Sequence, residues 1–156
     1  MNSLDNIIGE LCKVIFPIHE ESFLGNADST IAVCTLSSIT LLKKFANSDI
    51  MNNISIVGRL LSENNGIDAI IKYLNQNKKI STLVVCGTEV WGHKAGDSLL
   101  QLHINGVDDR GRIINSTSPN PFLTVTRSEV TYFQNRINLI NMIEETNFEL
   151  IKQQII

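Results

Sequence analysis

The sequence predicts an α/β fold, a single three-layer domain whose mostly parallel central sheet is flanked by helices. Apolar stretches with strand character alternate three times with amphipathic helical stretches, which is typical of right-handed crossovers around a parallel sheet. The expected strands are also nearly continuous apolar runs, as in strands buried on both faces. The chain has 156 residues, the length of one domain, so we treat 1–156 as one unit.

Four elements are expected in the first part of the chain. Residues 4–16 place apolar side chains at helical spacing, and the following proline would end that helix. The stretch 30–35 predicts a strand, and 37–47 predicts a helix capped by one of the two serines at its start. The stretch "ISIVG" at 54–58 predicts a second strand.

The remaining elements continue the alternation. Residues 67–77 form a helix with one apolar face, and 80–87 form a third strand. Residues 92–106 are expected to form a helix that ends at its Asn-Gly pair. We expect a short fourth strand at 111–115, a long helix over about 128–143, and a short helix at the end of the chain.

Composition narrows the function classes. A hydrophobic content of 43% and a charged content of 19% are ordinary for a folded protein, and a net charge of −3 argues against nucleic acid as a partner. No apolar run approaches the roughly 18 residues of a membrane-spanning segment, and the N-terminus lacks signal-peptide order. Three scattered cysteines without zinc spacing suit reduced thiols. We therefore expect a cytoplasmic chain.

Three loops are expected to form one site. They are "TLSS" at 35–38, "GRLLSENNG" at 58–66 and "GTEVWGHKAG" at 87–96, each directly after an expected strand. Ligands of parallel α/β sheets bind beyond the carboxyl ends of the strands, so these loops would lie side by side there. They are also the loops richest in glycine, hydroxyl, carboxylate and histidine side chains.

His93 in the third loop is the leading candidate for a metal ligand. A neutral imidazole binds cobalt, iron or zinc and needs an acceptor that holds its second nitrogen, a part that Glu89 can play from the same loop. Gly92 and Gly96 on either side would permit close approach by a flat or bulky group. The alternative is a histidine at a helix start that bonds only to backbone.

The donor set indicates what kind of metal group would bind. A zinc hydrolase needs about three converging protein ligands, and the other histidines are His19 and His103. His103 is ten residues further along the same expected helix, about 15 Å along its axis. Cys86, at the end of a strand, is more typical of a core residue. One strong ligand suits a metal whose other positions a macrocycle fills.

Other chemistries have weaker support. A hydrolase would pair Ser37 or Ser62 with His93, but no G-x-S-x-G motif is present. The glycine patterns of dinucleotide and phosphate loops are also missing. Glu63 and Asn64 can either cap the next helix or bind a ligand. The chain's single tryptophan, next to Gly92, can shield its loop or pack on a cofactor ring.

Four ordered blocks resemble a known family. They are "IAVCTLSS" (31–38), "VGRLLSENNGI" (57–67), "VVCGTEVWGH" (84–93) and "HINGVDDRGRII" (103–114), followed by "FQNRINLINMI" (133–143). Together they resemble the cytoplasmic corrinoid-binding domain found in the A subunit of tetrahydromethanopterin S-methyltransferase. The resemblance covers about residues 24–150, and the C-G-x-E-V-x-G-H segment is its most specific part.

The resemblance implies a Rossmann-like domain that binds cobalamin or another cobamide, with His93 as both the lower axial cobalt ligand and the catalytic residue. The chain would be a methyltransferase subunit of methanogenic one-carbon metabolism. It would accept a methyl group on cobalt from a partner methyltransferase subunit, then pass it to a thiol such as coenzyme M. Residues expected to line the corrin are Thr35, Leu36, Ser37, Gly58, Glu63, Asn64, Gly87, Glu89, Gly96 and Pro121, with Phe122 covering its edge.

Two departures from related patterns matter. Family members have a membrane-spanning helix, and this sequence contains none, so it is either a piece of a longer protein or a natural homologue without the anchor. We expect the natural homologue, with association to a membrane complex left open. The D-x-H-x-x-G signature of better-known cobalamin domains is half present, because Trp91 stands where the aspartate would be. Glu89 is therefore the expected partner of the imidazole. The alternative function is a cofactor-free interaction or regulatory module of the same fold.

Overall fold

The sheet has five strands, four of them parallel. The computed structural model describes residues 21–156, so the helix expected over 4–16 lies outside the described residues. The strands are β1 (Ser22–Leu24), β2 (Ile31–Cys34), β3 (Ile56–Gly58), β4 (Thr82–Gly87) and β5 (Asn138–Ile143). Their order is β1-β3-β2-β4-β5, and β1 alone pairs antiparallel, along the edge of β3.

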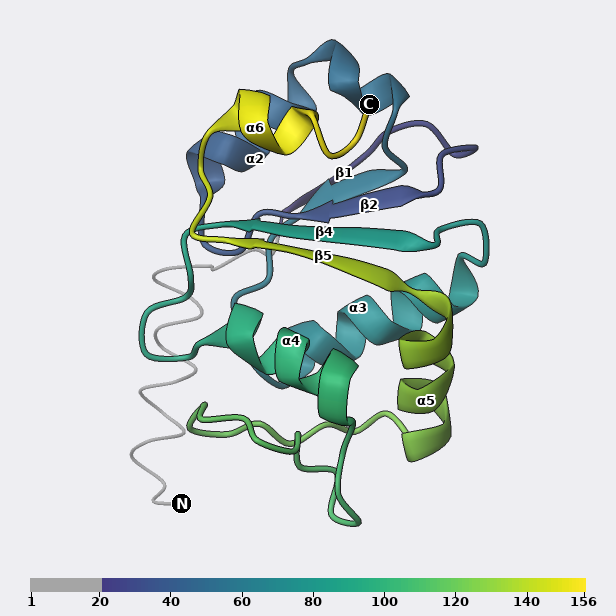
Figure 1. The fold of residues 1–156 in the computed structure, drawn as a ribbon, viewed down its shortest axis with the longest axis vertical. Coiled ribbons are helices and arrows are strands. Elements are labelled where there is room, and N and C mark those ends of the chain that lie inside the picture. Colours follow the sequence, from purple (N-terminus) through teal and green to yellow (C-terminus); the bar gives the residue numbers. More distant parts are fainter. Residues whose placement is uncertain (1–20) are drawn as a thin grey trace.

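Helices cover both faces of this sheet (Figure 1). Helix α2 (Ile39–Ala46) and helix α6 (Phe148–Lys152) lie on one face, together with the 3-10 helix η1 (Asp49–Asn52) that follows α2. Helices α3 (Asn65–Gln76), α4 (Ala95–Asn105) and α5 (Arg127–Arg136) lie on the other. Within residues 21–156, no helix combines the length and apolarity that a bilayer crossing requires.

The alternation of side chains along each strand builds two cores. In β4, Val84 and Cys86 pack with the α2 and α6 side chains, whereas Leu83 and Val85 pack with α3, α4 and α5. All four are at most 3% exposed, as expected for a strand covered on both faces. The predicted three-layer α/β fold is confirmed.

Most expected elements are confirmed within a few residues. Strands β2, β3 and β4 match the stretches expected at 30–35, 54–58 and 80–87, and helices α2, α3, α4 and α6 were all expected. Ser38 occupies the N-cap position of α2, but its side chain does not cap that helix. Its hydroxyl instead accepts a hydrogen bond from the Thr88 amide, 2.8 Å away.

Two expectations in the last third of the chain are wrong. The helix expected over 128–143 ends at Arg136, and the six residues of β5 pair in parallel with β4 along its whole length. The stretch 111–115 contributes no strand to the sheet and makes only isolated antiparallel bridges. Six residues of β4 pair with six residues of β5, and this tertiary pairing outweighs the preference that the helical spacing of apolar residues indicates.

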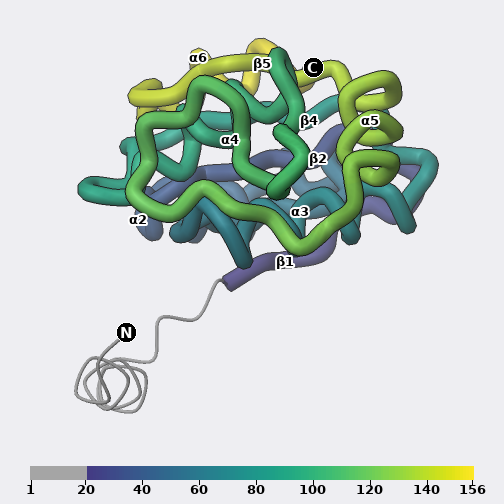
Figure 2. Tube along the Cα trace, turned by 90° about the horizontal axis from the view of Figure 1, so that it is seen from below, coloured from purple at the N-terminus to yellow at the C-terminus, as the bar shows by residue number. Residues whose placement is uncertain are grey.

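A long irregular segment connects α4 to α5 on the side of the sheet that these helices cover. Figure 2 shows it crossing α3 on its way to α5. The buried Asp68 of α3 holds its end, accepting hydrogen bonds from the backbone amides of Thr124 and Val125 and from the Thr124 hydroxyl. This segment passes beside the site described next.

Candidate functional site

His93 lies in a tight turn between β4 and α4. The Val90 carbonyl accepts hydrogen bonds from the amides of His93 (3.2 Å) and Lys94 (2.9 Å), which closes the turn. Gly92 and Lys94 have φ values of +80° and +49°, and the value at Gly92 is favourable only for a glycine. The turn projects from the carboxyl edge of the sheet and leaves the His93 side chain 55% exposed.

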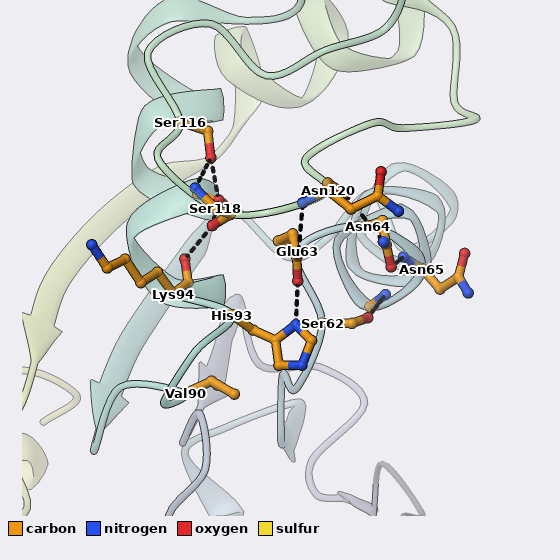
Figure 3. A network of polar contacts seen from close by, with 12 residues as sticks. Ser62, Glu63, Asn64, Asn65, Val90, His93, Lys94, Ser116, Ser118 and Asn120 are labelled. Atoms are coloured by element: carbon orange, nitrogen blue, oxygen red, sulfur yellow. Dashed lines mark hydrogen bonds and ion pairs between the residues drawn. The ribbon is translucent and has the colours of Figure 1, made fainter. Parts of the chain in front are cut away.

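Glu63, from the loop between β3 and α3, is the partner of the imidazole. Its Oε2 lies 2.8 Å from His93 Nδ1, and its Oε1 accepts the backbone amide of Asn120 at 3.0 Å (Figure 3). The Glu63 side chain is only 2% exposed, so it is a buried carboxylate whose two oxygens are both engaged.

This contact determines which ring nitrogen is available. A carboxylate can only accept hydrogen bonds, so Nδ1 donates, and in the neutral imidazole the lone pair of Nε2 then stays open. Among the described residues, Nε2 makes no hydrogen bond, and the ring is more than half exposed. An imidazole held through one nitrogen by a carboxylate is the usual arrangement of a histidine metal ligand.

The expectation that Glu89 orients His93 is wrong. Glu89 Oε1 accepts the amides of Val90 and Gly96, and Oε2 accepts the amide of Asp97, so this carboxylate caps the N-terminus of α4. A Cβ at Gly96 would lie 2.9 Å from both Glu89 Oε2 and Leu36 Cδ1. Gly96 thus permits close packing of these two side chains at the start of α4. At Gly92, by contrast, a Cβ would meet nothing within 4 Å.

The loop at 35–38 is hydrogen-bonded to the two other strand-end loops. Thr35 and Leu36 are both 0% exposed, so the expectation that they contact a cofactor is not supported by their burial. Ser37 donates its hydroxyl to the Thr88 carbonyl at 2.7 Å, and Arg59 donates to the Ser37 carbonyl at 3.1 Å. These bonds join all three strand-end loops into one edge, as the topology predicted.

The other expected residues occupy positions around this edge. A Cβ at Gly58 would lie 3.1 Å from the Ser22 side chain, and one at Gly87 would collide with the Thr35 carbonyl, so both glycines permit close packing within the protein. Asn64 is the N-cap of α3 and also donates to the Asn120 carbonyl at 3.2 Å. Pro121 is buried directly after Asn120.

Sequence reasoning missed the residues of the α4–α5 connection that reach this site. The Asn120 amide binds Glu63, and Ser118 and Ser116 join Ser98 of α4 in a buried hydroxyl cluster. Only Pro121 and Phe122 of this segment were expected near a ligand. The sequence holds no signal for the others, because they reach the site through tertiary contacts.

Other donors lie elsewhere or are already committed. His103 Nε2 lies 2.7 Å from the Ile137 carbonyl, and its ring packs edge-on against Phe133. Cys86 is fully buried, which confirms it as a core residue, and its thiol donates to the Cys34 carbonyl. This burial raises the pKa of the Cys86 thiol. Within residues 21–156, no three His, Cys, Asp or Glu side chains converge as a metal-binding group. Among the described residues neither Ser37 nor Ser62 makes a hydrogen bond to His93: the Ser37 hydroxyl donates to the Thr88 carbonyl, and the Ser62 hydroxyl accepts the Gly66 amide.

A cavity of about 260 Å³ lies between the sheet and α3, and His93 is not among the residues that line it. Its lining includes Gly58, which was expected to bind a cofactor, together with Arg59 and Gly66 of the same loop.

Fold and site together define an α/β domain with one exposed, carboxylate-held imidazole at the carboxyl edge of its parallel strands. Comparison with known families makes this specific. The family of tetrahydromethanopterin S-methyltransferase A subunits matches residues 14–156, and the chain belongs to this family.

Curated relatives agree with this assignment. The chain is 38% identical over 138 residues to a Methanosarcina acetivorans protein named as the A subunit of the putative methyltransferase Mtx, covering 88% of this chain and 66% of that protein. It is 32% identical to the A 2 subunit of Methanothermobacter marburgensis tetrahydromethanopterin S-methyltransferase (85% and 70% covered). It is 31% identical to the A 1 subunit of the Methanothermobacter thermautotrophicus enzyme (88% and 57% covered). The chain thus spans roughly two thirds or less of the length of most of these relatives.

Proposed function

We propose that this chain is the methyl-carrier subunit of a corrinoid-dependent methyltransferase and that His93 Nε2 is its protein ligand to cobalt. The observation that supports this most strongly is the His93–Glu63 pair, an exposed imidazole whose Nδ1 is held 2.8 Å from a buried carboxylate. The relatives are named as methyltransferase subunits, which supports a role in methyl transfer.

The residues present fit a cobalt corrinoid. A macrocycle supplies most of the donors to its own metal, so the protein would need to add only one, and this site offers one imidazole. Its position on an open edge suits a wide, flat group better than an enclosed cavity would. When bound, the corrinoid would supply the metal centre that accepts a methyl group from one partner and releases it to a thiol.

The chain's own residues would bind and orient. His93 Nε2 would donate its lone pair to the metal, while Glu63 keeps the proton on Nδ1 and holds the ring plane. The Asn120 amide holds Glu63 in turn. The methyl donor and acceptor would be brought by partner subunits. We propose methyl-tetrahydromethanopterin as donor, after the pterin in the relatives' names, and a thiol as acceptor, with coenzyme M suggested by the resemblance given above.

Retention of hydroxocobalamin tests this proposal. Wild type and His93→Ala would each be mixed with it, freed of excess by gel filtration and examined by visible spectroscopy. We expect wild type to retain the cofactor and His93→Ala to change its axial-ligand bands. His103→Ala, whose imidazole bonds to backbone away from the site, is the matched control and should behave as wild type.

Two outcomes would contradict the proposal. If wild type retains no corrinoid, the cofactor-free interaction module of the same fold becomes the better account. If His93→Ala binds with an unchanged spectrum, the cofactor stands but His93 is not its ligand. Cofactor-independent esterase activity that His93→Ala abolishes would favour a hydrolase instead.

A further inference from the structure

Three buried serines hold the turn that bears His93. Ser98 of α4 is 0% exposed, and its Oγ lies 2.6 Å from the Oγ atoms of both Ser116 and Ser118. Ser116 and Ser118 belong to the segment 116–120, which we call the strap. Figure 3 shows the strap reaching both Lys94, next to His93, and Glu63.

Counting hydroxyl protons fixes the direction of these bonds. Ser118 donates its single hydroxyl proton to the Lys94 carbonyl at 3.2 Å, so in its contact with Ser98 it must be the acceptor. Ser98 therefore donates its hydroxyl proton to Ser118. Because Ser98 has no second hydroxyl proton, Ser116 must be the donor in its contact with Ser98. The result is a one-way chain of hydrogen bonds, from Ser116 through Ser98 and Ser118 to the Lys94 carbonyl, which strengthens each member.

This chain ends at a backbone position that needs support. Lys94 has φ +49° and ψ +46°, a left-handed conformation that disfavours a residue with a side chain. Its carbonyl accepts both the Ser118 hydroxyl and the Ser98 amide of α4. Because Lys94 directly follows His93, holding the Lys94 carbonyl restricts the backbone from which the exposed imidazole leaves the turn.

The same strap also holds the other half of the pair. Two residues beyond Ser118, the Asn120 amide donates to Glu63 Oε1, and the Asn120 carbonyl accepts from Asn64. One five-residue segment thus positions both the backbone next to His93 and the carboxylate that binds its ring. The strap itself is anchored separately, because Arg112 donates to the Ser116 carbonyl at 3.0 Å.

We propose that the strap sets the orientation of the His93 imidazole from two sides, and that Ser98 and Ser118 are positioning residues for the ligand nitrogen. The effect of the strap on axial ligation rests on the proposed function. The effect of the strap on the orientation of the imidazole does not, and it can be tested without any cofactor.

The test uses Ser118→Ala and Ser98→Ala in the full chain. Long-range ¹H–¹⁵N spectra report the His93 ring nitrogens, with His103 as an internal reference. We expect both variants to shift the His93 ring signals and leave those of His103 in place. With hydroxocobalamin, the dissociation constant should rise by about 3- to 10-fold, the effect of one lost hydrogen bond acting through an outer partner of the metal ligand.

Two controls separate positioning from general stability. Ser118→Thr keeps the hydroxyl and should restore wild-type values. Thr126→Ala removes the capping box of α5, away from the turn, and should lower thermal stability without moving the His93 signals. If Ser98→Ala fails to fold, Ser118→Ala decides alone.

Unchanged His93 signals in Ser118→Ala would overturn the inference, as would equal shifts in Thr126→Ala. If wild type binds no hydroxocobalamin, the proposed function fails, and the ring signals still decide whether the strap positions His93.

Discussion

Glu63→Gln is the most informative single substitution in this protein. The side chain keeps its shape but changes from two acceptor oxygens to one acceptor and one donor. Glu63 Oε1 serves the Asn120 amide and Oε2 faces His93 Nδ1. The introduced amide oxygen should stay with Asn120, because an unsatisfied buried amide costs about 1–3 kcal/mol.

The introduced amide nitrogen would then point at Nδ1 and force it to accept. The imidazole proton moves to Nε2, which removes the lone pair that the metal needs. We expect the free energy of unfolding to fall by about 1 kcal/mol, the net value of one hydrogen bond. Corrinoid affinity should fall by about 10- to 100-fold, as is usual when an outer partner of a metal-binding histidine is lost.

Long-range ¹H–¹⁵N spectra of the cofactor-free protein measure the tautomer of the His93 ring directly. They would be recorded at a pH well above the ordinary histidine pKa of about 6.5. Wild type should show the hydrogen on Nδ1 and Glu63→Gln the hydrogen on Nε2. Glu89→Gln is the matched control, with the same charge change in the same turn region, and should keep the wild-type tautomer. A Glu63→Gln protein that retains hydrogen on Nδ1 would show that Glu63 does not set the tautomer of His93.

Three further results are expected. The thiols of Cys34 and Cys86 are buried, and burial raises the pKa of Cys86, so neither should react with iodoacetamide at pH 8 before unfolding, as peptide mass spectrometry would show; rapid labelling of either would contradict this. Asp68→Ala should cost about 2–4 kcal/mol in urea unfolding, because it orphans two backbone amides, and a loss below about 1 kcal/mol would count against that role. Gly87→Ala should destabilise more than Gly92→Ala, since both have positive φ but only the first collides with backbone; equal melting temperatures would contradict this.

The central part of the fold followed from the sequence because its strands are apolar runs bounded by helices with clear faces. The stretch that became β5 did not, since Phe133, Ile137 and Ile140 have helical spacing and no glycine or proline marks the change. A single residue, Ile137, separates α5 from the strand. What decides the conformation is the open edge of β4, which local sequence does not reveal.

The site was predicted in the same uneven way. His93 and Glu63 were both named, because each lies in a loop after a parallel strand. The pairing was wrong, since Glu89 is near His93 in sequence but is used as the cap of α4. Glu63 is thirty residues away and meets the ring only through the sheet topology. Ser98 and Ser118 had no sequence signal, because an isolated serine indicates no partner.

We propose that a protein imidazole, that of His93, binds cobalt. Electron paramagnetic resonance of the cobalt(II) corrinoid complex tests it directly, because an axial nitrogen splits the cobalt lines into triplets when it is ¹⁴N and doublets when it is ¹⁵N. Protein labelled with ¹⁵N-histidine and loaded with unlabelled cofactor should give doublets, which His93→Ala removes. Triplets in the labelled protein would show that the axial nitrogen belongs to the cofactor and that His93 is not the cobalt ligand.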